Sequence, residues 1–319
     1  MVTRTRNQPK DDQLNIKQLQ NKRVQKPQPR LTDSEVRKKR RDVAKKTRDL
    51  IRPISKALHL TTPPSGYKAT FKNTEPLKPT GKSFPGLSPL TVKVVRGDTF
   101  ETAVTLDNAR ELMGCQDTQT ICVLNFANAR SMGGGWLNGA MAQEEELCYR
   151  STLSATLKPR FYPLGELEAV YSPNVVIFRE NYAKNHSLMW HETPELLPVV
   201  SIISIAAPDR PATTVADDGQ EKYLNPLDRD MMKDKMRLIL RVAGHSGHRR
   251  LVLGAFGCGV FRNPKHDVAH CWAEVLKENE FKGWWEMIVF AILEKNADSV
   301  DGAGLTLRIL RSILGNLQV

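Results

Sequence analysis

Length, composition and charge exclude several classes of protein before any motif is considered. The chain has 319 residues, of which 40% are hydrophobic and 26% charged, as in an ordinary globular protein with a real core. No run approaches the roughly 18 to 20 apolar residues that a membrane span needs, and the N-terminus lacks the apolar core of a secretory signal, so we expect an intracellular protein. Five scattered cysteines without a CxxC pair indicate free thiols in a reducing compartment.

The positive charge is concentrated in the N-terminal part of the chain. Residues 1–50 carry 16 Lys and Arg against 6 Asp and Glu, a net charge of +10 out of +12. Residues 1–31 have the composition of a disordered basic tail. The capping-box pattern that begins at Thr32 and the helical spacing of apolar residues predict a basic amphipathic helix over 32–58. Its RKKRR cluster at 37–41 is either a solvated helix face or a patch for nuclear import or for binding polyanions. The expected location in the cell is therefore the nucleus, the cytoplasm or both.

The rest of the chain alternates between strand and helix patterns. Short β-branched runs occur at 91–95, 121–126, 174–178, 199–207, 251–256 and 286–293. Helical patterns lie between several of them, at 104–113, 142–157, 228–243 and 265–279. This alternation, without an internal repeat, predicts one α/β domain over 59–319 with a largely parallel or mixed sheet.

Two of the predicted strands lead into glycine-rich loops. GGGWLNG follows the strand ICVLNF, and GAFGCGVFRNP at 254–264 overlaps the end of LVLGAF. In open α/β sheets ligands lie at the carboxyl ends of strands, where glycine lets backbone N–H groups approach an anion. The pair favours a diphosphate held from two sides over two simple tight turns, and no GK[ST] follows either loop. Trp136, inside the first loop, either covers the ligand or packs in the core.

Three consecutive glutamates, Glu144, Glu145 and Glu146, begin the helix predicted after the first loop. Crowded carboxylates raise one another's pKa, so one of them can keep a proton near neutral pH and act as an acid, although a helix N-terminus opposes this shift. Helical neighbours are about 100° apart, so at most two of the three should face a cleft, and we expect Glu146 to be turned away. The alternative is an acidic helical turn that faces solvent.

A metal site is the competing interpretation of the histidines. The candidate ligands are His245, His248, His266, His270, Cys258 and Cys271. No four of them have zinc-finger spacing. We therefore expect neither a metal nor another cofactor.

The spacing of GGG, seven residues and QEE resembles the signature of the microbial type of poly(ADP-ribose) glycohydrolase. The blocks VLNFANA, SPNVVIFRENY, SIISIAAPD and LVLGAFGCGVFRNP are similar to family blocks and stand in the family order across most of 40–300. The resemblance implies a macrodomain-like three-layer α/β/α sandwich with a central mixed sheet. It implies metal-independent hydrolysis of the ribose–ribose O-glycosidic bond of poly(ADP-ribose), with release of ADP-ribose. The basic tail lies outside the family core.

The resemblance also assigns roles to individual residues. Glu145 matches the catalytic acid/base, Glu144 matches the neighbour that orients the ribose, and Gln143 would support the loop. Asn128 matches a contact to the distal ribose. The implied substrate-binding residues further include Gly133, Gly134 and Gly135 on one side of the diphosphate, backbone amides of Gly257, Cys258, Gly259 and Val260 on the other, Phe261 against the distal ribose, and Asp98 at the adenine.

Two other functions share this pocket. One is a non-catalytic ADP-ribose reader, which would have no need for the paired glutamates, and the other is a mono-ADP-ribosyl hydrolase. The expected partners are poly(ADP-ribose), ADP-ribose and ADP-ribosylated proteins, with no membrane. Contact with nucleic acid is open only for the basic tail.

Overall fold

A computed structural model describes residues 32–58, 66–109, 119–189, 194–293 and 303–319. The predicted basic tail at 1–31 therefore lies outside the described residues. Within the described ranges, none of the helices combines the length and the apolar character that a membrane crossing demands.

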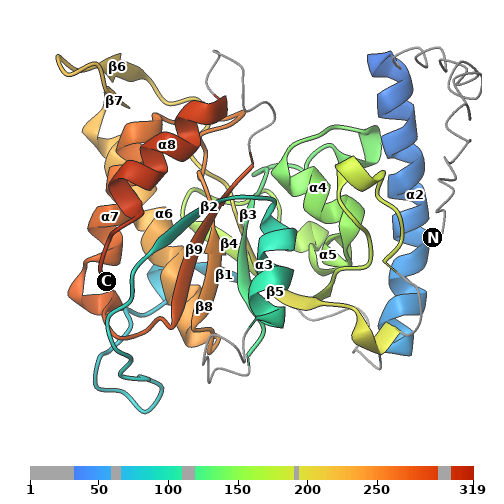
Figure 1. The fold of residues 1–319 in the computed structure, drawn as a ribbon, viewed down its shortest axis with the longest axis horizontal. Coiled ribbons are helices and arrows are strands. Elements are labelled where there is room, and N and C mark those ends of the chain that lie inside the picture. The colour runs from blue at the N-terminus through green and yellow to red at the C-terminus, as the bar shows by residue number, and fades with distance from the viewer. Residues whose placement is uncertain (1–31, 59–65, 110–118, 190–193, 294–302) are drawn as a thin grey trace, which may run out of the picture.

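The core of the fold is a seven-stranded mixed sheet with the strand order β1-β4-β5-β3-β8-β9-β2 (Figure 1). The pairs β1–β4 and β4–β5 are antiparallel, and all the others are parallel. A separate hairpin pairs β6 with β7. The strands are β1 Tyr67–Thr70, β2 Lys93–Arg96, β3 Cys122–Phe126, β4 Glu168–Val176, β5 Val199–Ile205, β6 Thr213–Val215, β7 Glu221–Tyr223, β8 Arg250–Leu253 and β9 Met287–Ile292.

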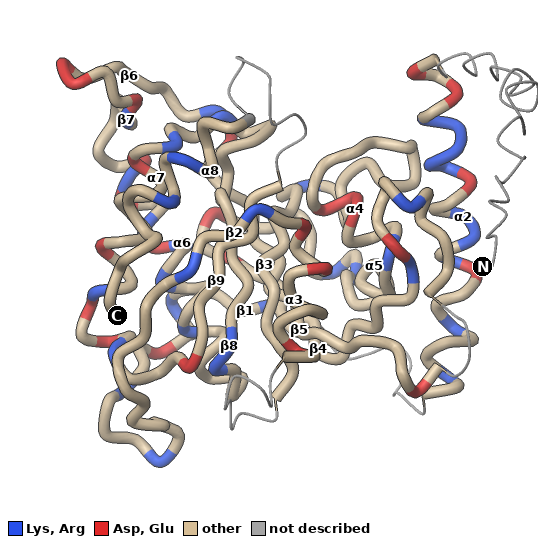
Figure 2. The backbone as a smooth tube through the Cα atoms, in the orientation of Figure 1, with Lys and Arg blue, Asp and Glu red and all other residues tan. Residues whose placement is uncertain are grey.

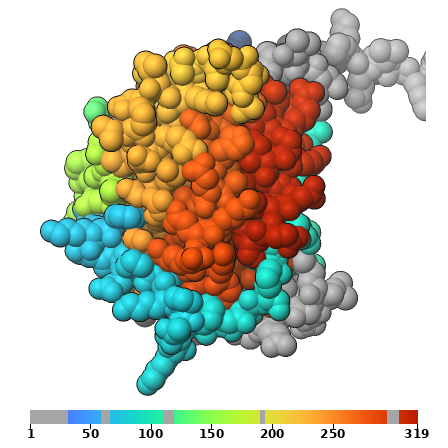
Figure 3. Space-filling view, turned by 90° about the vertical axis from the view of Figure 1, so that its left-hand side faces the viewer, coloured from blue at the N-terminus to red at the C-terminus, as the bar shows by residue number. Residues whose placement is uncertain are grey.

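Helices cover both faces of the sheet and form the outer layers of an α/β/α sandwich. The α-helices are α2 Asp33–Ala57, α3 Thr99–Asn108, α4 Gln143–Arg150, α5 Leu153–Thr156, α6 Pro226–His245, α7 Lys265–Leu276 and α8 Ala303–Leu314. Six short 3-10 helices are η1 Phe71–Asn73, η2 Trp136–Asn138, η3 Pro159–Phe161, η4 Tyr182–Lys184, η5 Pro194–Leu196 and η6 Asn279–Phe281. Helices α6, α7 and α8 lie on one face, and α3, α4 and α5 lie on the other. Figure 3 shows α7 and α8 side by side over the first of these faces.

Burial on both faces explains why the central strands read as continuous apolar runs. Every residue of β9 is buried, and so is every residue of β8. On one face Trp272 of α7 packs edge-on against Phe290 of β9, with ring centroids 5.5 Å apart. On the other face Phe100 of α3 is fully buried. Parallel strands covered by helices on both sides have this composition, so the alternation predicted from the sequence is confirmed.

The helix predicted over 142–157 is interrupted at Ser151 and Thr152. The Ser151 hydroxyl donates to the Leu147 carbonyl, 2.7 Å away, and the backbone of Ser151 is extended. The backbone N–H of Thr152 donates to the Val176 carbonyl, and the Thr152 hydroxyl accepts from the Val176 N–H. Hydroxyl side chains that bond the backbone compete with helix hydrogen bonds, and here the neighbouring strand supplies the alternative partner.

Helix α2 packs against the domain beside α4 and η2. Its N-terminus has the predicted capping box between Thr32 and Glu35. The Thr47 hydroxyl donates to the Tyr149 carbonyl at 2.7 Å and accepts from Arg179 Nε at 2.8 Å. Ile54 is fully buried, in a cluster with Val176 and Phe178 of the domain. Lys and Arg recur along the helix with Asp and Glu between them (Figure 2), while Ala44, Ile51 and Ile54 are buried.

This packing predicts that Ile54→Ala lowers the free energy of unfolding by about 2 to 5 kcal/mol, the usual cost of truncating a fully buried isoleucine. Arg52→Ala, at an exposed position on the same helix, is the matched control and should change it by less than about 0.5 kcal/mol. Urea unfolding measures both values. Equal, small effects of the two substitutions would show that α2 does not contribute to the stability of the domain.

Candidate active site

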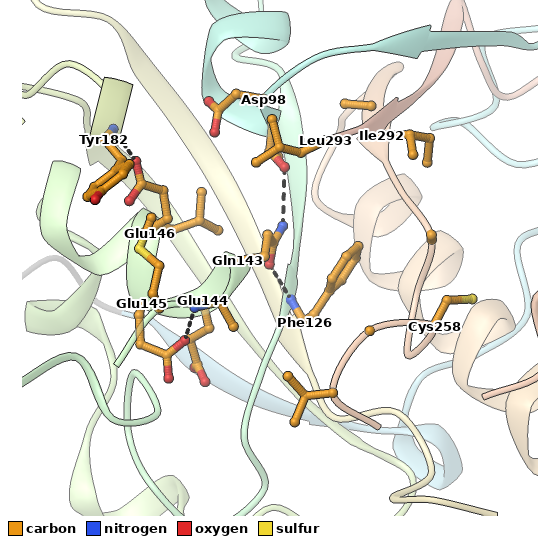
Figure 4. Close-up of a pocket in the computed structure, with 18 of the residues that line it drawn as sticks. Asp98, Phe126, Gln143, Glu144, Glu145, Glu146, Tyr182, Cys258, Ile292 and Leu293 are labelled. Carbon is orange, nitrogen blue, oxygen red and sulfur yellow. Dashed lines mark hydrogen bonds between the residues drawn. The ribbon is translucent and has the colours of Figure 1, made fainter. Parts of the chain in front are cut away.

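A cavity of about 910 Å³ opens at the carboxyl ends of the parallel strands. Its lining includes Phe126 at the end of β3, Ala255 after β8 and Ile292 at the end of β9. The first turn of α4 forms one side and the loop after β8 forms another, so the glutamates and Cys258 lie across the cavity from each other (Figure 4). The two loops singled out in the sequence therefore meet at one site.

Gln143, the first residue of α4, connects this helix to the end of β3. Its side-chain amide nitrogen, Nε2, donates to the Leu124 carbonyl at 2.7 Å and to the Thr99 hydroxyl at 3.3 Å. Its Oε1 accepts from the backbone N–H of Phe126 at 2.8 Å. Gln143 thus fixes the start of α4 relative to the sheet, and with it the direction of the glutamates that follow.

Glu145 lies at the cavity with both carboxylate oxygens held by backbone N–H groups. Oε1 accepts from Gly135 at 2.8 Å, and Oε2 accepts from Ala142 at 2.9 Å. The side chain belongs to the cavity lining although the residue is only 9% exposed. The carboxyl group is therefore oriented by the loop before it reaches any ligand.

Glu144 is buried more deeply, and burial raises the pKa of its carboxyl to about 8, with the charge of Glu145 adding to the shift. Hydrogen bonds oppose this shift, principally the 2.7 Å bond from the backbone N–H of Asn128 to Oε2. A long 3.4 Å contact joins Oε1 to Asn125 Nδ2. Glu144 therefore keeps a proton at neutral pH. The sequence predicted such a proton in the cluster but not on which glutamate.

Glu146 is buried and contributes to the cavity lining, so the expectation that it is turned away from the cleft is wrong. Its Oε1 accepts from the backbone N–H of Tyr182 at 2.9 Å, and its Oε2 lies 2.8 Å from His186 Nε2. It points toward Tyr182, while Glu144 and Glu145 point the other way (Figure 4). The segment around η4 packs over α4 and supplies these donors. The alternative of a solvent-facing acidic turn is excluded, because all three glutamates are buried.

The three glycines of the first loop serve the glutamates in this structure. Gly135 donates to Glu145, the backbone N–H of Gly133 hydrogen bonds to Glu144, and Gly134 donates to the Ser131 carbonyl. Gly134 has φ +59°, and a Cβ there would lie 2.4 Å from Glu145 Oε1. None of the three glycines is part of the cavity lining. This differs from the expected diphosphate contact, because the amides that would make it are already engaged.

Trp136 packs beneath the glycine loop. It is 3% exposed, and its ring lies edge-on to Tyr149 with centroids 6.1 Å apart. The Tyr149 hydroxyl contacts the carbonyls of Trp136 and Ala140 at 2.9 and 2.7 Å. Of the two uses that the sequence left open for Trp136, the structure shows core packing.

The second loop is different, because most of its amides are available. Within the described ranges, no hydrogen-bond acceptor pairs with the backbone N–H of Gly257, Gly259, Val260 or Phe261, and all four residues line the cavity. Cys258 departs from the prediction, since its N–H donates to the Ala255 carbonyl at 3.1 Å. Successive free N–H groups at a strand end form a concave anion site.

Asn263 holds this loop in shape. Its Nδ2 donates to the Pro208 carbonyl at 2.8 Å and to the Gly257 carbonyl at 3.1 Å. Gly257 has φ +76°, and a Cβ there would lie 2.6 Å from Asn263 Nδ2 and 2.7 Å from Ala207 Cβ. Only glycine fits this position without a shift of its neighbours.

Asp98 and Asn128 line the cavity, but part of each side chain has a structural use. Asp98 Oδ1 caps α3 by accepting from the N–H groups of Phe100 and Glu101, and it pairs with Arg150 Nη1 at 2.5 Å. Asn128 Oδ1 accepts from two backbone N–H groups of its own loop. The adenine role of Asp98 and the ribose role of Asn128 stay predictions.

Several cavity residues were not predicted from the sequence. They include Arg40, Glu101, Asn181, Tyr182, Ala183 and Thr306. Arg40 stood in the basic cluster of α2, and Asn181 and Tyr182 stood in the block SPNVVIFRENY, so both had a visible signal. Thr306 belongs to α8, which no pattern indicated.

The histidines proposed as metal ligands have other partners. His248 contacts the Tyr171 hydroxyl and the Thr120 carbonyl, and His245 contacts the Glu75 carbonyl. Across the described part of the chain, no group of three or more His, Cys, Asp or Glu side chains has a geometry that could hold a metal ion.

The pKa of Glu144 predicts how stability depends on pH. The folded protein holds the proton up to about pH 8, whereas an unfolded carboxyl releases it near the ordinary value of 4.5. The contribution of Glu144 to stability is therefore full below pH 4.5 and is lost as the pH rises through 8. Glu144→Gln removes this titration, so its stability relative to the parent should increase from about pH 5 to about pH 8.5, as urea unfolding measures. Parallel pH profiles of the two proteins would contradict the assignment.

Comparisons with known proteins agree with this arrangement. The family model described as microbial-type PARG, catalytic domain, matches residues 7–180, a segment that includes most of the basic tail, α2 and the three glutamates. The expectation that the tail lies outside the family core is therefore wrong. The poly(ADP-ribose) glycohydrolase of Thermomonospora curvata is 26% identical, with a TM-score of 0.65, and the match covers 86% of this chain and 98% of that one.

A structure of the Thermomonospora enzyme with the inhibitor ADP-HPD matches with a TM-score of 0.64 at 26% identity, over 86% of this chain and 98% of that one. The poly(ADP-ribose) glycohydrolase of Deinococcus radiodurans in complex with ADP-ribose is 28% identical, with a TM-score of 0.62, over 82% of this chain and 96% of that one. No protein with curated annotation matches. With its macrodomain-like α/β/α sandwich, the chain belongs to the family of microbial-type PARG catalytic domains.

Proposed function

We propose that this protein hydrolyses the ribose–ribose O-glycosidic bonds of poly(ADP-ribose) and releases ADP-ribose, with Glu145 as the acid/base. One observation carries the proposal: two buried carboxyl groups, held by backbone N–H groups, face a cavity that offers unpartnered amides across from them. The second loop would bind the diphosphate, and the glutamates would then stand at the adjacent glycosidic bond.

The cavity has the size and chemistry that such a ligand needs. About 910 Å³ lies in the range of pockets for drug-sized ligands. The amides of Gly257, Gly259, Val260 and Phe261 would donate hydrogen bonds to the diphosphate oxygens. The related Deinococcus enzyme was crystallised with ADP-ribose, which supports a ligand of this class here.

The reaction would proceed in two proton transfers. The reaction would start from the protonated form of Glu145, which donates its proton to the leaving ribose 2′-oxygen while the bond from that oxygen to the anomeric carbon of the next ribose breaks, and an oxocarbenium-like centre develops; the second step restores the protonated form. The carboxylate then takes a proton from water as the water oxygen bonds to the anomeric carbon. The products are ADP-ribose and a shortened chain with a free 2′-hydroxyl.

Neighbouring groups would position the ribose for this step. A protonated Glu144 can donate a hydrogen bond to a ribose hydroxyl, which a carboxylate cannot do. The free Nδ2 group of Asn128 and the ring of Phe261 line the same cavity. Each contact restrains the sugar near Glu145, and such restraint is a large part of enzymatic rate enhancement.

A mono-ADP-ribosyl hydrolase would use the same pocket and remains the second candidate. The reader function fits less well, because binding alone gives no reason to bury two adjacent carboxyl groups. ADP-ribosylated proteins as partners, nuclear location and nucleic-acid contact through the tail stay predictions. The proposed chemistry draws only on groups of the chain itself.

The proposal predicts that Glu145→Gln lowers the rate of ADP-ribose release about 10²- to 10⁴-fold, the usual contribution of an acid/base group. The amide keeps the size of the side chain and one of its two backbone hydrogen bonds, and the proposed diphosphate contacts lie in the second loop, so the affinity for ADP-ribose should change little. Glu195→Gln, an exposed position in η5, is the matched control and should keep the parent rate. Chromatography of the products measures the rate of ADP-ribose release by the parent and by both variants. Parent-like turnover by Glu145→Gln would remove Glu145 from the mechanism. Glu146→Gln is not a neutral control, because Glu146 holds Tyr182.

A second prediction addresses the diphosphate. ADP-ribose should raise the melting temperature of the parent, by linkage, and AMP should raise it much less. Gly257→Val should abolish the ADP-ribose effect, because its side chain would collide with Asn263 and Ala207. Gly259→Ala meets open space and keeps its N–H, so it should retain the effect. Equal stabilisation by AMP and ADP-ribose would contradict a diphosphate site in this loop.

A further inference from the structure

The basic helix α2 contributes a side chain to the catalytic cavity. Arg40 is among the lining residues, and its Nε donates to the Gly139 carbonyl at 2.8 Å. Gly139 has φ +76°, and a Cβ there would lie 2.4 Å from the Arg37 carbonyl oxygen, so the helix backbone lies directly on the turn. This turn is η2, which follows Gly135, the residue whose N–H holds Glu145. The helix is therefore fixed to the loop that orients the proposed acid.

Two further arginines extend this basic surface outward from the cavity. Arg37 and Arg41 line a second, more open hollow of about 540 Å³ together with Asp33 and Ser34 of α2 and Asn138 of η2. They are one helical turn apart and so lie on the same side of α2. Both side chains are exposed. Arg40, Arg37 and Arg41, which we call the arginine patch, thus run from the cavity lining to the surface.

The arginine patch forms no ion pair with any carboxylate that the structure describes. Within the described ranges, none of its three guanidinium groups lies within ion-pair distance of an acidic side chain. The arginines packed against the sheet and the C-terminal helices behave differently. Those in ion pairs are Arg150 with Asp98, Arg229 with Asp267 and Glu274, Arg237 with Asp234 and Glu278, Arg241 with Glu280, and Arg250 with Asp107. Asp33 shares the outer hollow with Arg37 and Arg41 but forms no ion pair with them in the described part of the chain. Three arginines against this one carboxylate leave a net positive charge that suits an anion from outside the chain.

The position of the patch indicates which anion this is. Helix α4 lies between the sheet and α2 (Figure 1), so its glutamates separate the amides of the loop after β8 from the arginine patch. A polymer unit with its diphosphate on those amides places its scissile bond at Glu145. The chain then continues past the glutamates toward α2. The diphosphate of the next unit carries two negative charges. A guanidinium group can bind two phosphate oxygens at once through parallel N–H groups.

We propose that Arg37, Arg40 and Arg41 form a second subsite, which binds the diphosphate of the poly(ADP-ribose) unit on the leaving-group side of the scissile bond. This inference rests on the proposed function and adds a preference for polymer over the isolated ADP-ribose unit. The subsite would hold the leaving chain while Glu145 protonates its 2′-oxygen. The subsite also assigns a function to the arginine patch, which the alternative interpretation as a solvated helix face does not.

The test uses the full-length chain with Glu145→Gln, so that bound polymer is not cleaved. Arg37→Gln/Arg41→Gln is the test variant, because Arg40 also holds Gly139 and its loss would disturb the loop. Lys39→Gln/Lys46→Gln removes the same charge from exposed positions of α2. At about 100° per residue these lysines face away from Arg37 and Arg41. Dissociation constants are measured for poly(ADP-ribose), for ADP-ribose and for a single-stranded DNA with a matched number of phosphates, at low and high salt.

We expect the arginine variant to bind poly(ADP-ribose) about tenfold more weakly, and the slope of log Kd against log salt to fall by about 1, as one or two phosphate contacts are lost. The ADP-ribose affinity should stay within about twofold, since one unit does not reach the second subsite. The lysine variant should match its Glu145→Gln parent for both ligands. DNA should bind more weakly than the polymer and respond less to the arginine substitutions.

Three results would overturn the subsite. They are an unchanged polymer affinity in the arginine variant, an equal loss in the lysine variant, and DNA that binds as tightly as the polymer with the same loss. The last result would indicate a general nucleic-acid surface. Hydrolysis by the protein with Glu145 intact separates the two proposals. If the protein with Glu145 intact releases ADP-ribose from the polymer but the arginine variant keeps its polymer affinity, only the subsite is wrong. If the protein with Glu145 intact releases no ADP-ribose from the polymer, the proposed function is overturned.

Discussion

The site depends on hydrogen bonds from backbone N–H groups to buried carboxyl groups. Removing a carboxylate from water is costly unless donors replace the water. Here Gly135 and Ala142 donate to Glu145, and Asn128 donates to Glu144. The glycines let the backbone come close enough to do so, and Gly134 shows the limit, since a Cβ there would reach Glu145. The three consecutive glutamates therefore lie beside the three glycines because the buried carboxyl groups need backbone donors that only a loop without side chains can bring so close.

This arrangement divides the work between the two glycine-rich loops. The first loop uses the amides of Gly133 and Gly135 on the glutamates and that of Gly134 on its own Ser131 carbonyl, while the second loop keeps most of its amides free at the cavity. The sheet brings them together because β3 and β8 are parallel neighbours, so both loops leave the same edge. Helix α2 closes the outer side of the first loop. A fixed acid and an open anion site at one cavity edge are what hydrolysis beside a diphosphate requires.

Much of this could be predicted from local patterns. The apolar runs located β3, β5, β8 and β9 because buried parallel strands are continuous in sequence, and the glutamates were expected on the helix after the first loop. The use of each amide was not predictable, since glycine permits a close approach without indicating its partner. Glu146 was misjudged because the segment around Tyr182 that buries it is distant in sequence. The apolar spacing in α2 predicted an amphipathic helix, and its apolar side, with Ile54, is buried.

The most direct test of the account is the choice of substrate by the purified protein. Poly(ADP-ribose) and a mono-ADP-ribosylated protein are incubated with it separately, and the released products are identified by mass. The proposed acid beside the proposed diphosphate site, with a basic surface beyond it, predicts rapid release of ADP-ribose from the polymer and slower release from the modified protein. Release from the modified protein alone, with the polymer intact, would contradict it.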